Sequence, residues 1–295
     1  MQTEITIIEP GRRTKTYLKD LWRYRDLMML FVKRDFTAQY KQTILGPLWH
    51  FIKPALTTAV SVLLFNVVAG IGTNGVNSVA FQMAGIIIWN YFAACFTSTS
   101  NTFIANAGIF GKVYFPRLVT PISVVISQLI QFGIQLLLLL SVMAFLHFKG
   151  ILYVEPQALQ TANWKLQTAN WLLIPLVLIL MAGLGLGTGI IISSITTKYR
   201  DLTVLIGFGV QLLMYASAVN YPLSALEKLT ESHPVIFAFI KYNPLTTLVE
   251  LFRNAILGLP VDYGAMGYGA VWVVALIFIG IRMFSRVERT FMDTV

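Results

Sequence analysis

The residues able to do chemistry are few and scattered along the chain. His50, His147 and His233 lie far apart, and no HExxH or CxxC pattern connects them. Metal sites need ligands at short, characteristic spacings, so we expect no metal site. The single cysteine, Cys95, excludes a disulfide within the chain. We also expect no catalytic residues.

One segment has a weak likeness to a phosphate-binding loop. GIFGK at 108–112 places Asn106 where the loop needs its first glycine, and Val113 where it needs Ser or Thr. We therefore expect no ATP binding and no cofactor in this chain. The carboxylates Glu155, Glu227, Glu231 and Asp262 form no recognisable catalytic pair.

The composition indicates a membrane protein. Hydrophobic residues make up 56% of the chain and charged residues 12%, whereas soluble domains carry about 25% charge. The mean hydropathy is +0.70. A net charge of +9 does not indicate nucleic-acid binding, because the basic residues cluster at the ends of apolar segments, where they contact lipid headgroups.

Long windows without charged residues predict an all-α polytopic fold with six transmembrane helices. The expected spans are about 48–69, 79–102, 118–147, 171–195, 202–224 and 263–281. The glycine-rich stretch 70–75 separates the first two. Residues 1–47 form the N-terminal segment, residues 48–284 the transmembrane domain, and residues 285–295 a short tail.

Before the first span, apolar residues recur every three or four positions from Thr14 to about Leu45. This spacing predicts an amphipathic helix that lies in the membrane interface or packs against a partner. Gly46 and Pro47 then mark a corner where the chain turns into the bilayer.

The basic residues predict the orientation. Six crossings place both termini on one side, which then holds all but five of the 22 lysines and arginines. The positive-inside rule makes that side cytoplasmic. The five others are Lys149, Lys165, Lys228, Lys241 and Arg253.

Residues 233–258 are apolar but interrupted by charged and turn-forming residues. Asn243 suits a helix N-cap, Pro244 a first helical position, and Gly258 the position after the last turn. This pair of short helices is expected to dip in from outside as a gate, with Glu250 and Arg253 on its second helix. The alternative is a helix lying on the external surface.

The predicted span interiors carry no charged residues, and their polar residues are neutral. Proton- or sodium-coupled carriers generally need ionisable or coordinating groups there. If the chain moves a substrate uphill, its energy comes from a separate subunit. The fourth span also contains two interleaved GxxxG pairs, 183/187 and 185/189, which predict close helix packing.

Five segments resemble the type-2 ABC-transporter permeases that export polysaccharides such as O-antigen, capsular polysaccharide and teichoic acid. They are RDFTAQYKQTILGPLW (34–49), GKVYFPRLVTPIS (111–123), KYRDL (198–202), KYNPLTTLVELFRNAILG (241–258) and RVERTFMDTV (286–295). The likeness covers nearly the whole chain. It departs where the family usually reads Ser-Pro-Val: Ala218 replaces the proline, so we expect a straighter fifth helix.

The resemblance implies a homodimer paired with two copies of a separate ATPase, which holds ATP and Mg²⁺. It implies a cytosolic coupling helix whose aromatic rings enter the ATPase while its basic residues pair with acidic groups; an ordinary basic loop is the alternative. The coupling residues are Gly108, Phe110, Gly111, Lys112, Tyr114, Phe115, Pro116 and Arg117. The interface helix and hinge contain Arg34, Asp35, Tyr40, Leu45, Gly46, Pro47 and Trp49.

The resemblance further implies export of a lipid-linked polysaccharide across the bacterial cytoplasmic membrane. Candidate pore-lining residues are Trp49, Asn90, Tyr91, Tyr215 and Tyr221. Arg200 and Asp201 are expected to pair at the cytoplasmic mouth, unless Asp201 caps the fifth helix. Two alternatives remain: an exporter of a small molecule, drug or lipid, and a membrane enzyme acting on lipid-linked sugars.

Overall fold

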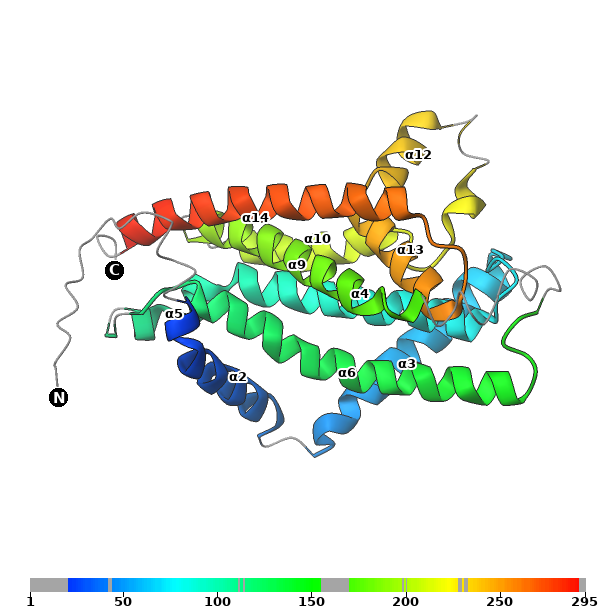
Figure 1. The fold of residues 1–295 in the computed structure, drawn as a ribbon, viewed down its shortest axis with the longest axis horizontal. Helices are drawn as coiled ribbons and strands as arrows, with labels where there is room; N and C mark the ends of the chain where they lie inside the picture. Colours follow the sequence, from blue (N-terminus) through cyan, green and yellow to red (C-terminus); the bar gives the residue numbers. More distant parts are fainter. Residues whose placement is uncertain are drawn as a thin grey trace.

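The computed structural model describes residues 21–41, 44–110, 112–113, 115–154, 170–197, 199, 201–227, 230 and 233–291. Within these ranges the fold is helical, and the only β-type pairing is an isolated bridge between Val76 and Tyr153. Figure 1 shows α4, α6, α9 and α14 running side by side along the long axis of the molecule. The prediction of an all-α polytopic membrane protein is confirmed.

Five helical segments are long and apolar enough to cross a bilayer. They are the first span Gly46–Val68, α4 (Ser78–Ser100), α6 (Val119–Phe148), α9 (Ile174–Thr196) and α14 (Tyr263–Phe291), the last being apolar as far as Val287. The first span joins a 3₁₀ turn (Gly46–Leu48), α3 (Trp49–Ser61) and a π-helical stretch (Val62–Val68). Each has at least 23 residues, and about 20 suffice to cross the hydrocarbon core.

The shorter helices lie at the two ends of this bundle. At one end, here called the α2 end, lie α2 (Arg25–Tyr40), α5 (Thr102–Phe110) and the last turns of α14. At the opposite end, the α12 end, lie α12 (Pro234–Lys241) and α13 (Pro244–Leu257), which are bent by 62°. The described chain therefore starts and finishes at the same end of the bundle.

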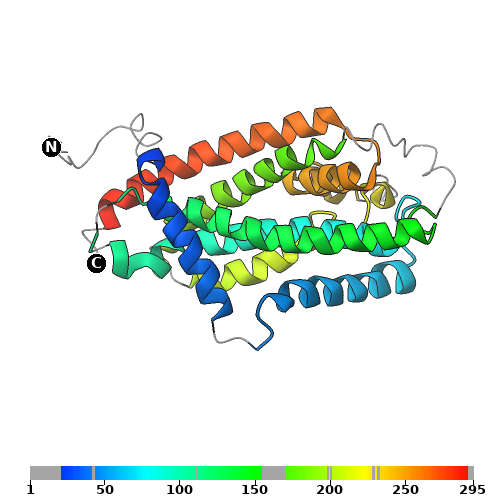
Figure 2. The same cartoon turned by 60° about the horizontal axis from the view of Figure 1, so that its bottom comes forward.

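Within the segment predicted to form the interface helix, about 14–45, the structure has a helix over Arg25–Tyr40. Figure 2 shows α2 lying across the direction of the spans and not along it. Its Phe31 and Val32 are buried against the bundle, while Trp22 (just before α2), Met29 and Leu30 are exposed. The segment therefore packs on its own chain with some apolar residues and presents others to its surroundings.

The predicted corner at Gly46 and Pro47 is also present. Gly46 has a φ of +47°, a backbone conformation that costs glycine little because it lacks a Cβ atom. Pro47 follows within the first turn of the 3₁₀ segment, where its missing N–H group leaves no intrahelical hydrogen bond unmade. The break predicted at 70–75 is confirmed as well, since the chain leaves the first span at Val68 and re-enters at Ser78.

The two GxxxG pairs of α9 pack against different helices. Gly183 and Gly187 lie against α14, where an added Cβ would come within 2.6 Å of the Val273 side chain and 3.0 Å of the Ile277 nitrogen, respectively. Gly185 and Gly189 lie against α4, close to Cys95 and Thr99. This confirms the prediction of close packing and explains why the glycines interleave.

The fifth span differs from the prediction. The helix expected over 202–224 ends early: α10 is Leu202–Tyr215, which has 14 residues and a length of about 21 Å. Ser224 nevertheless donates a hydrogen bond to Asn74 in the α3–α4 loop, so the chain reaches the α12 end through a non-helical segment, 216–222. The expected straighter helix is wrong, because Ala218 adopts a φ of +49°, which a helix does not allow.

The last helix extends beyond the expected end of the transmembrane domain at residue 284. The segment assigned to a separate tail, 285–295, continues α14 as far as Phe291. Nothing in RVERTF interrupts a helix, because the segment lacks glycine and proline.

Candidate functional site

At the α2 end, the segment between α5 and α6 packs against the interface helix. Phe110 and Phe115 are 3% and 5% exposed, and their ring centroids lie 5.7 Å apart. Phe115 also lies 5.6 Å from Phe31 of α2. The expectation that these two rings enter the ATPase is therefore not met, because both are buried within this chain.

The charged residues of this segment divide into buried and exposed groups. Arg117 is largely buried, with its guanidinium 5.5 Å from the centre of the Phe110 ring. Lys112 is exposed, and so is the neighbouring Val113. Gly108 is exposed and Pro116 partly so, whereas Gly111 and Tyr114 lie outside the described residues. A partner at this surface would therefore meet Lys112 and Val113 first.

The interface helix is tied to α5 by polar contacts as well. Arg34 donates to Asn106 Oδ1 at 3.4 Å and pairs with Asp35 at 2.8 Å. Its guanidinium also lies 4.7 Å from the centre of the Phe31 ring. Arg34 and Asp35 therefore link α2 to the segment between α4 and α6. Tyr40 is the last residue of α2.

Between α2 and the spans lies a cleft of about 810 Å³, here called the amide cleft. It is lined by Gln39 from α2, by Asn90 from α4 and by Gln131 and Gln135 from α6, while α3 supplies the fourth wall. The lining residues on the α3 side are Gly46, Trp49, His50, Lys53, Pro54, Leu56 and Thr57.

Two side-chain pairs cross the amide cleft. Asn90 donates to Gln135 Oε1 at 3.3 Å, joining α4 to α6. Gln131 donates to Gln39 Oε1 at 2.6 Å, joining α6 to α2. Of the described lining residues, none is Asp or Glu. The cleft therefore offers amide hydrogen-bonding groups within the membrane-crossing part of the chain, with Lys53 as the one Lys or Arg among its described lining residues.

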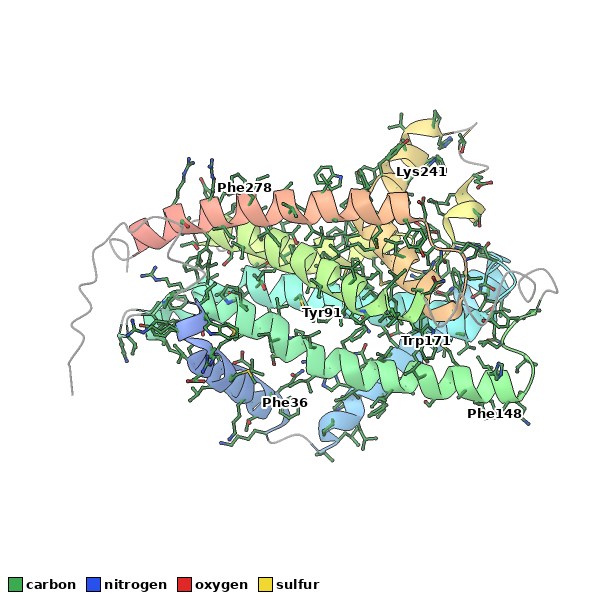
Figure 3. All side chains as sticks on the ribbon, in the orientation of Figure 1. Phe36, Tyr91, Phe148, Trp171, Lys241 and Phe278 are labelled. Atoms are coloured by element: carbon green, nitrogen blue, oxygen red, sulfur yellow. The ribbon has the colours of Figure 1, made fainter. Side chains whose placement is uncertain are left out.

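Only some of the candidate pore-lining residues lie at this cleft. Asn90 and Trp49 line it, and Leu45 lies just before the hinge. Tyr91 points elsewhere: it is 3% exposed and packs 5.4 Å from Phe132, and Figure 3 shows it inside the bundle. Tyr215 is exposed on α10, and its carbonyl accepts a hydrogen bond from the Tyr221 hydroxyl.

At the α12 end, α13 holds the chain that follows α10. The Asn243 side chain caps the helix by accepting from the Leu245 amide at 3.0 Å, as predicted, and donates to the Ala216 carbonyl at 3.1 Å. Glu250 accepts from the Leu223 amide at 2.9 Å. The predicted gate residues therefore connect α13 to segment 216–223.

The ends of α13 match the sequence pattern. Pro244 occupies its first turn, and Gly258 follows its last turn with a φ of +72°. The bend of 62° between α12 and α13 falls at Tyr242 and Asn243, because Pro244 disfavours a helical conformation in the residue before it.

Arg253 is the most buried charged residue among those described, at 1% exposure. It donates to the carbonyls of Ala218 at 3.0 Å and Val219 at 2.6 Å, and its guanidinium lies 3.9 Å from the centre of the Phe81 ring. A Cβ atom at Gly85 would come within 2.6 Å of this guanidinium. The glycine therefore makes room for the arginine.

The same segment is held from the other side by α4. Gln82 donates to the Asn220 carbonyl at 2.8 Å and to Asn66 Oδ1 at 3.1 Å. Asn66 lies in the π-helical stretch of the first span, and such stretches often mark functional positions. Gln82 thus links the first span to segment 216–223, a role that its position in an apolar sequence did not predict.

At the cytoplasmic mouth, the sequence predicted either a pair of Arg200 with Asp201 or a helix cap. Asp201 does occupy the N-cap position of α10, but its side chain makes no capping hydrogen bond. The capping alternative is therefore wrong. Arg200 lies outside the described residues.

The glutamines of the amide cleft were visible in the sequence as neutral polar residues, but not as a site. The signal was their spacing: Gln128, Gln131 and Gln135 recur at intervals of three and four and so share one face of α6. Gln39 gave no such signal, because only the fold brings α2 beside α6.

Together these elements define a multi-pass helical membrane protein with a polar cleft inside its transmembrane region, the architecture of a permease. A family model described as "ABC-2 type transporter" matches residues 26–257, and the chain belongs to this family. It is 27% identical to an O-antigen export system permease protein RfbA of Klebsiella pneumoniae, over 91% of this chain and 94% of that protein.

Two further relatives have similar coverage. An O-antigen export system permease protein RfbA of Myxococcus xanthus is 27% identical over 94% of this chain and 98% of its own length. The polysialic acid transport protein KpsM of Escherichia coli is 22% identical over 88% of this chain and 93% of its own length. All three similarities thus extend over nearly the whole transmembrane region.

Proposed function

We propose that this chain is the membrane-spanning permease subunit of an ATP-driven exporter that moves a lipid-linked polysaccharide across the bacterial cytoplasmic membrane. The observation that carries the proposal is the similarity, over nearly the full length, to permeases named for O-antigen export and polysialic acid transport. The amide cleft supports it, because sugar hydroxyls require hydrogen-bonding partners that lipid does not supply.

The proposal places the energy source in a separate ATPase. From Pro54 to Phe110 the sequence contains no Asp, Glu, Lys or Arg, so beyond Lys53 the first two spans carry no charged residue for coupling to a proton or sodium gradient. The α5–α6 segment, from Thr102 to Leu118, is too short to form an ATPase domain. ATP and Mg²⁺ would therefore be bound by the partner subunit.

The contact surface for the ATPase would be the α2 end. Most basic residues lie towards this end in the expected topology, which makes it the cytoplasmic one. Lys112 and Val113 are exposed there, while Phe110 and Phe115 connect the same segment to α2. A movement imposed on Lys112 would thus be transmitted to α2 through buried rings.

The proposal also includes a second copy of the chain. Only 17% of the apolar window of the first span is buried, and α10 exposes Val204, Leu205 and Phe208. A helix of 14 residues is too short to cross the bilayer alone. A homodimer joined along α3 and α10 would cover these surfaces and enclose the non-helical segment 216–222.

The test is genetic and biochemical. Deleting the gene should abolish surface polysaccharide and leave lipid-linked glycan inside the cell. Export should return when this chain is supplied with an active ATPase, and not with an ATPase that cannot hydrolyse ATP. Unchanged surface polysaccharide, with loss of a small molecule or lipid instead, would favour the first alternative. Sugar transfer by the purified chain without any ATPase would favour a membrane enzyme.

A further inference from the structure

We infer that the amide cleft is a binding subsite for sugar residues of the exported glycan. The inference rests on the proposed function and assigns a position within each subunit where the glycan is held. It concerns Asn90 and Gln135, whose amides pair between α4 and α6, Gln131, which pairs with Gln39 of α2, and Trp49 on the α3 wall.

The position of the cleft makes its polarity unusual. At about 1.5 Å per residue, Gln131 lies roughly 18 Å from the start of α6 at the α2 end. Asn90 lies a similar distance from the start of α4 at the α12 end. Asn90 is therefore near the middle of a hydrocarbon core about 30 Å thick, and Gln131 lies nearer the α2 end, where it contacts Gln39 of α2. Polar side chains at this depth are costly in lipid and usually mark a path for a polar substrate.

The two side-chain pairs of the cleft leave hydrogen-bonding capacity unused. A primary amide carries two N–H donors and an oxygen that accepts two hydrogen bonds, and the pair of Asn90 with Gln135 uses one donor and one acceptor. Sugar hydroxyls, which both donate and accept, match this set of groups.

The size and the walls of the cleft suit a carbohydrate. Its volume of about 810 Å³ falls in the usual range of 300–1,000 Å³ for ligand sites. Trp49 is partly exposed in the α3 wall and gives a flat aromatic face for the apolar side of a sugar ring. No carboxylate is among the described lining residues and Lys53 carries a positive charge, so the cleft does not select for cationic substrates.

The competing explanation is purely structural. Interhelical amide pairs stabilise helix packing in membranes, and Asn90–Gln135 would do this with no ligand. The two explanations differ in one observable respect. A subsite must be reached by water from one side of the membrane and must become covered when glycan is present.

Cysteine accessibility distinguishes them. The natural Cys95 is buried and can be removed as Cys95→Ala. In that background, Gln131→Cys places one thiol in the α6 wall, and Thr57→Cys places one in the α3 wall. Leu137→Cys on the exposed side of α6 is the matched control. Each variant is co-expressed with its ATPase, and inverted membranes are treated with a charged thiol reagent that does not cross lipid.

We expect the reagent to modify Gln131→Cys and Thr57→Cys but not Leu137→Cys. Membranes from cells that make the lipid-linked glycan should show modification slowed by about tenfold, a difference of about 1.4 kcal/mol, relative to membranes from cells unable to make it. If the reagent modifies neither introduced thiol, even in membranes without glycan, the inference is overturned. Equal rates with and without glycan would also overturn it, and would identify a water-filled cleft only.

These results are separable from the proposed function. Surface polysaccharide is measured in the gene-deletion strain complemented by the Cys95→Ala chain. If export is restored while glycan gives no protection at either wall, the proposed function stands and the subsite is wrong. If the chain restores no export at all, the proposed function itself fails.

Discussion

The ring of Phe31 on α2 lies 5.6 Å from the ring of Phe115, which leads into α6. This contact joins the transverse helix to the segment expected to meet the ATPase. Phe110 and the α14 residue Phe284 complete the same buried cluster, so the contact is part of the core and not a surface feature.

Replacing either ring should uncouple ATP hydrolysis from export without preventing assembly. Phe31→Ala and Phe115→Ala remove the same contact, so their effects should not add. A double-mutant cycle on unfolding in detergent should give a coupling energy of about 0.5–1.5 kcal/mol, typical of aromatic pairs. Strict additivity would show that the two rings act independently.

Lys112 is an exposed basic residue next to this cluster. Reversing the charge of its side chain should weaken binding of the ATPase. Lys112→Glu introduces repulsion if the partner surface is acidic, and rim charges of this kind act mainly on the association rate. Co-purification of the ATPase with a tagged permease, at low and at high salt, measures the effect.

Lys149→Glu is the matched control, because Lys149 is exposed at the opposite end of α6. It should leave co-purification unchanged. A loss of the ATPase in both variants to the same extent would contradict the assignment of the α2 end as the contact surface.

Arg253→Met should destabilise the protein by about 3 kcal/mol. The substitution removes two charge-assisted hydrogen bonds to the carbonyls of Ala218 and Val219, each of which is typically worth about 1.5–3 kcal/mol. Part of this is offset because a buried charge no longer has to be desolvated. Denaturation of the purified protein gives the difference in unfolding free energy.

The exposed Lys241 provides the comparison for Arg253. It lies at the end of α12, as Figure 3 shows, and Lys241→Met should change stability by less than about 0.5 kcal/mol. A similar loss in both variants would mean that the effect arises from net charge and not from the buried hydrogen bonds.

Gly85→Ala should be harmful although alanine favours helices. Its Cβ would lie 2.4 Å from the Val219 carbonyl oxygen and 2.6 Å from the Arg253 guanidinium, and overpacking of this kind costs about 1–3 kcal/mol. A Cβ atom added at Gly133 of α6 would meet nothing within 4 Å. Gly133→Ala should therefore raise the unfolding free energy by up to about 1 kcal/mol through helix propensity. Thermal unfolding of both variants tests the contrast, and equal stability would contradict it.

The features that the sequence predicted well are those set by neighbouring residues. The span positions follow from runs of apolar residues, and the ends of α13 follow from Asn243, Pro244 and Gly258. The glycine pairs of α9 likewise predicted close packing, although the sequence could not say that one pair faces α14 and the other α4.

The features that it missed depend on distant contacts. The α10 helix ends at Tyr215 because Arg253, 35 residues beyond Ala218, binds the carbonyls that follow it. Phe110 and Phe115 looked like surface residues because their partner, Phe31, lies far away in the sequence. The amide cleft needed Gln39, Asn90 and Gln131 from three separate helices, and no local pattern connects them.

The glycines of α9 have a mechanical consequence. Along its contacts with α4 and α14, this helix presents hydrogen atoms where other helices present flexible side chains, so neither neighbour can slide without backbone atoms colliding. These three helices must keep their spacing through a transport cycle. In the proposed homodimer, any widening of a passage between the two copies would therefore be left to the first span and to α10.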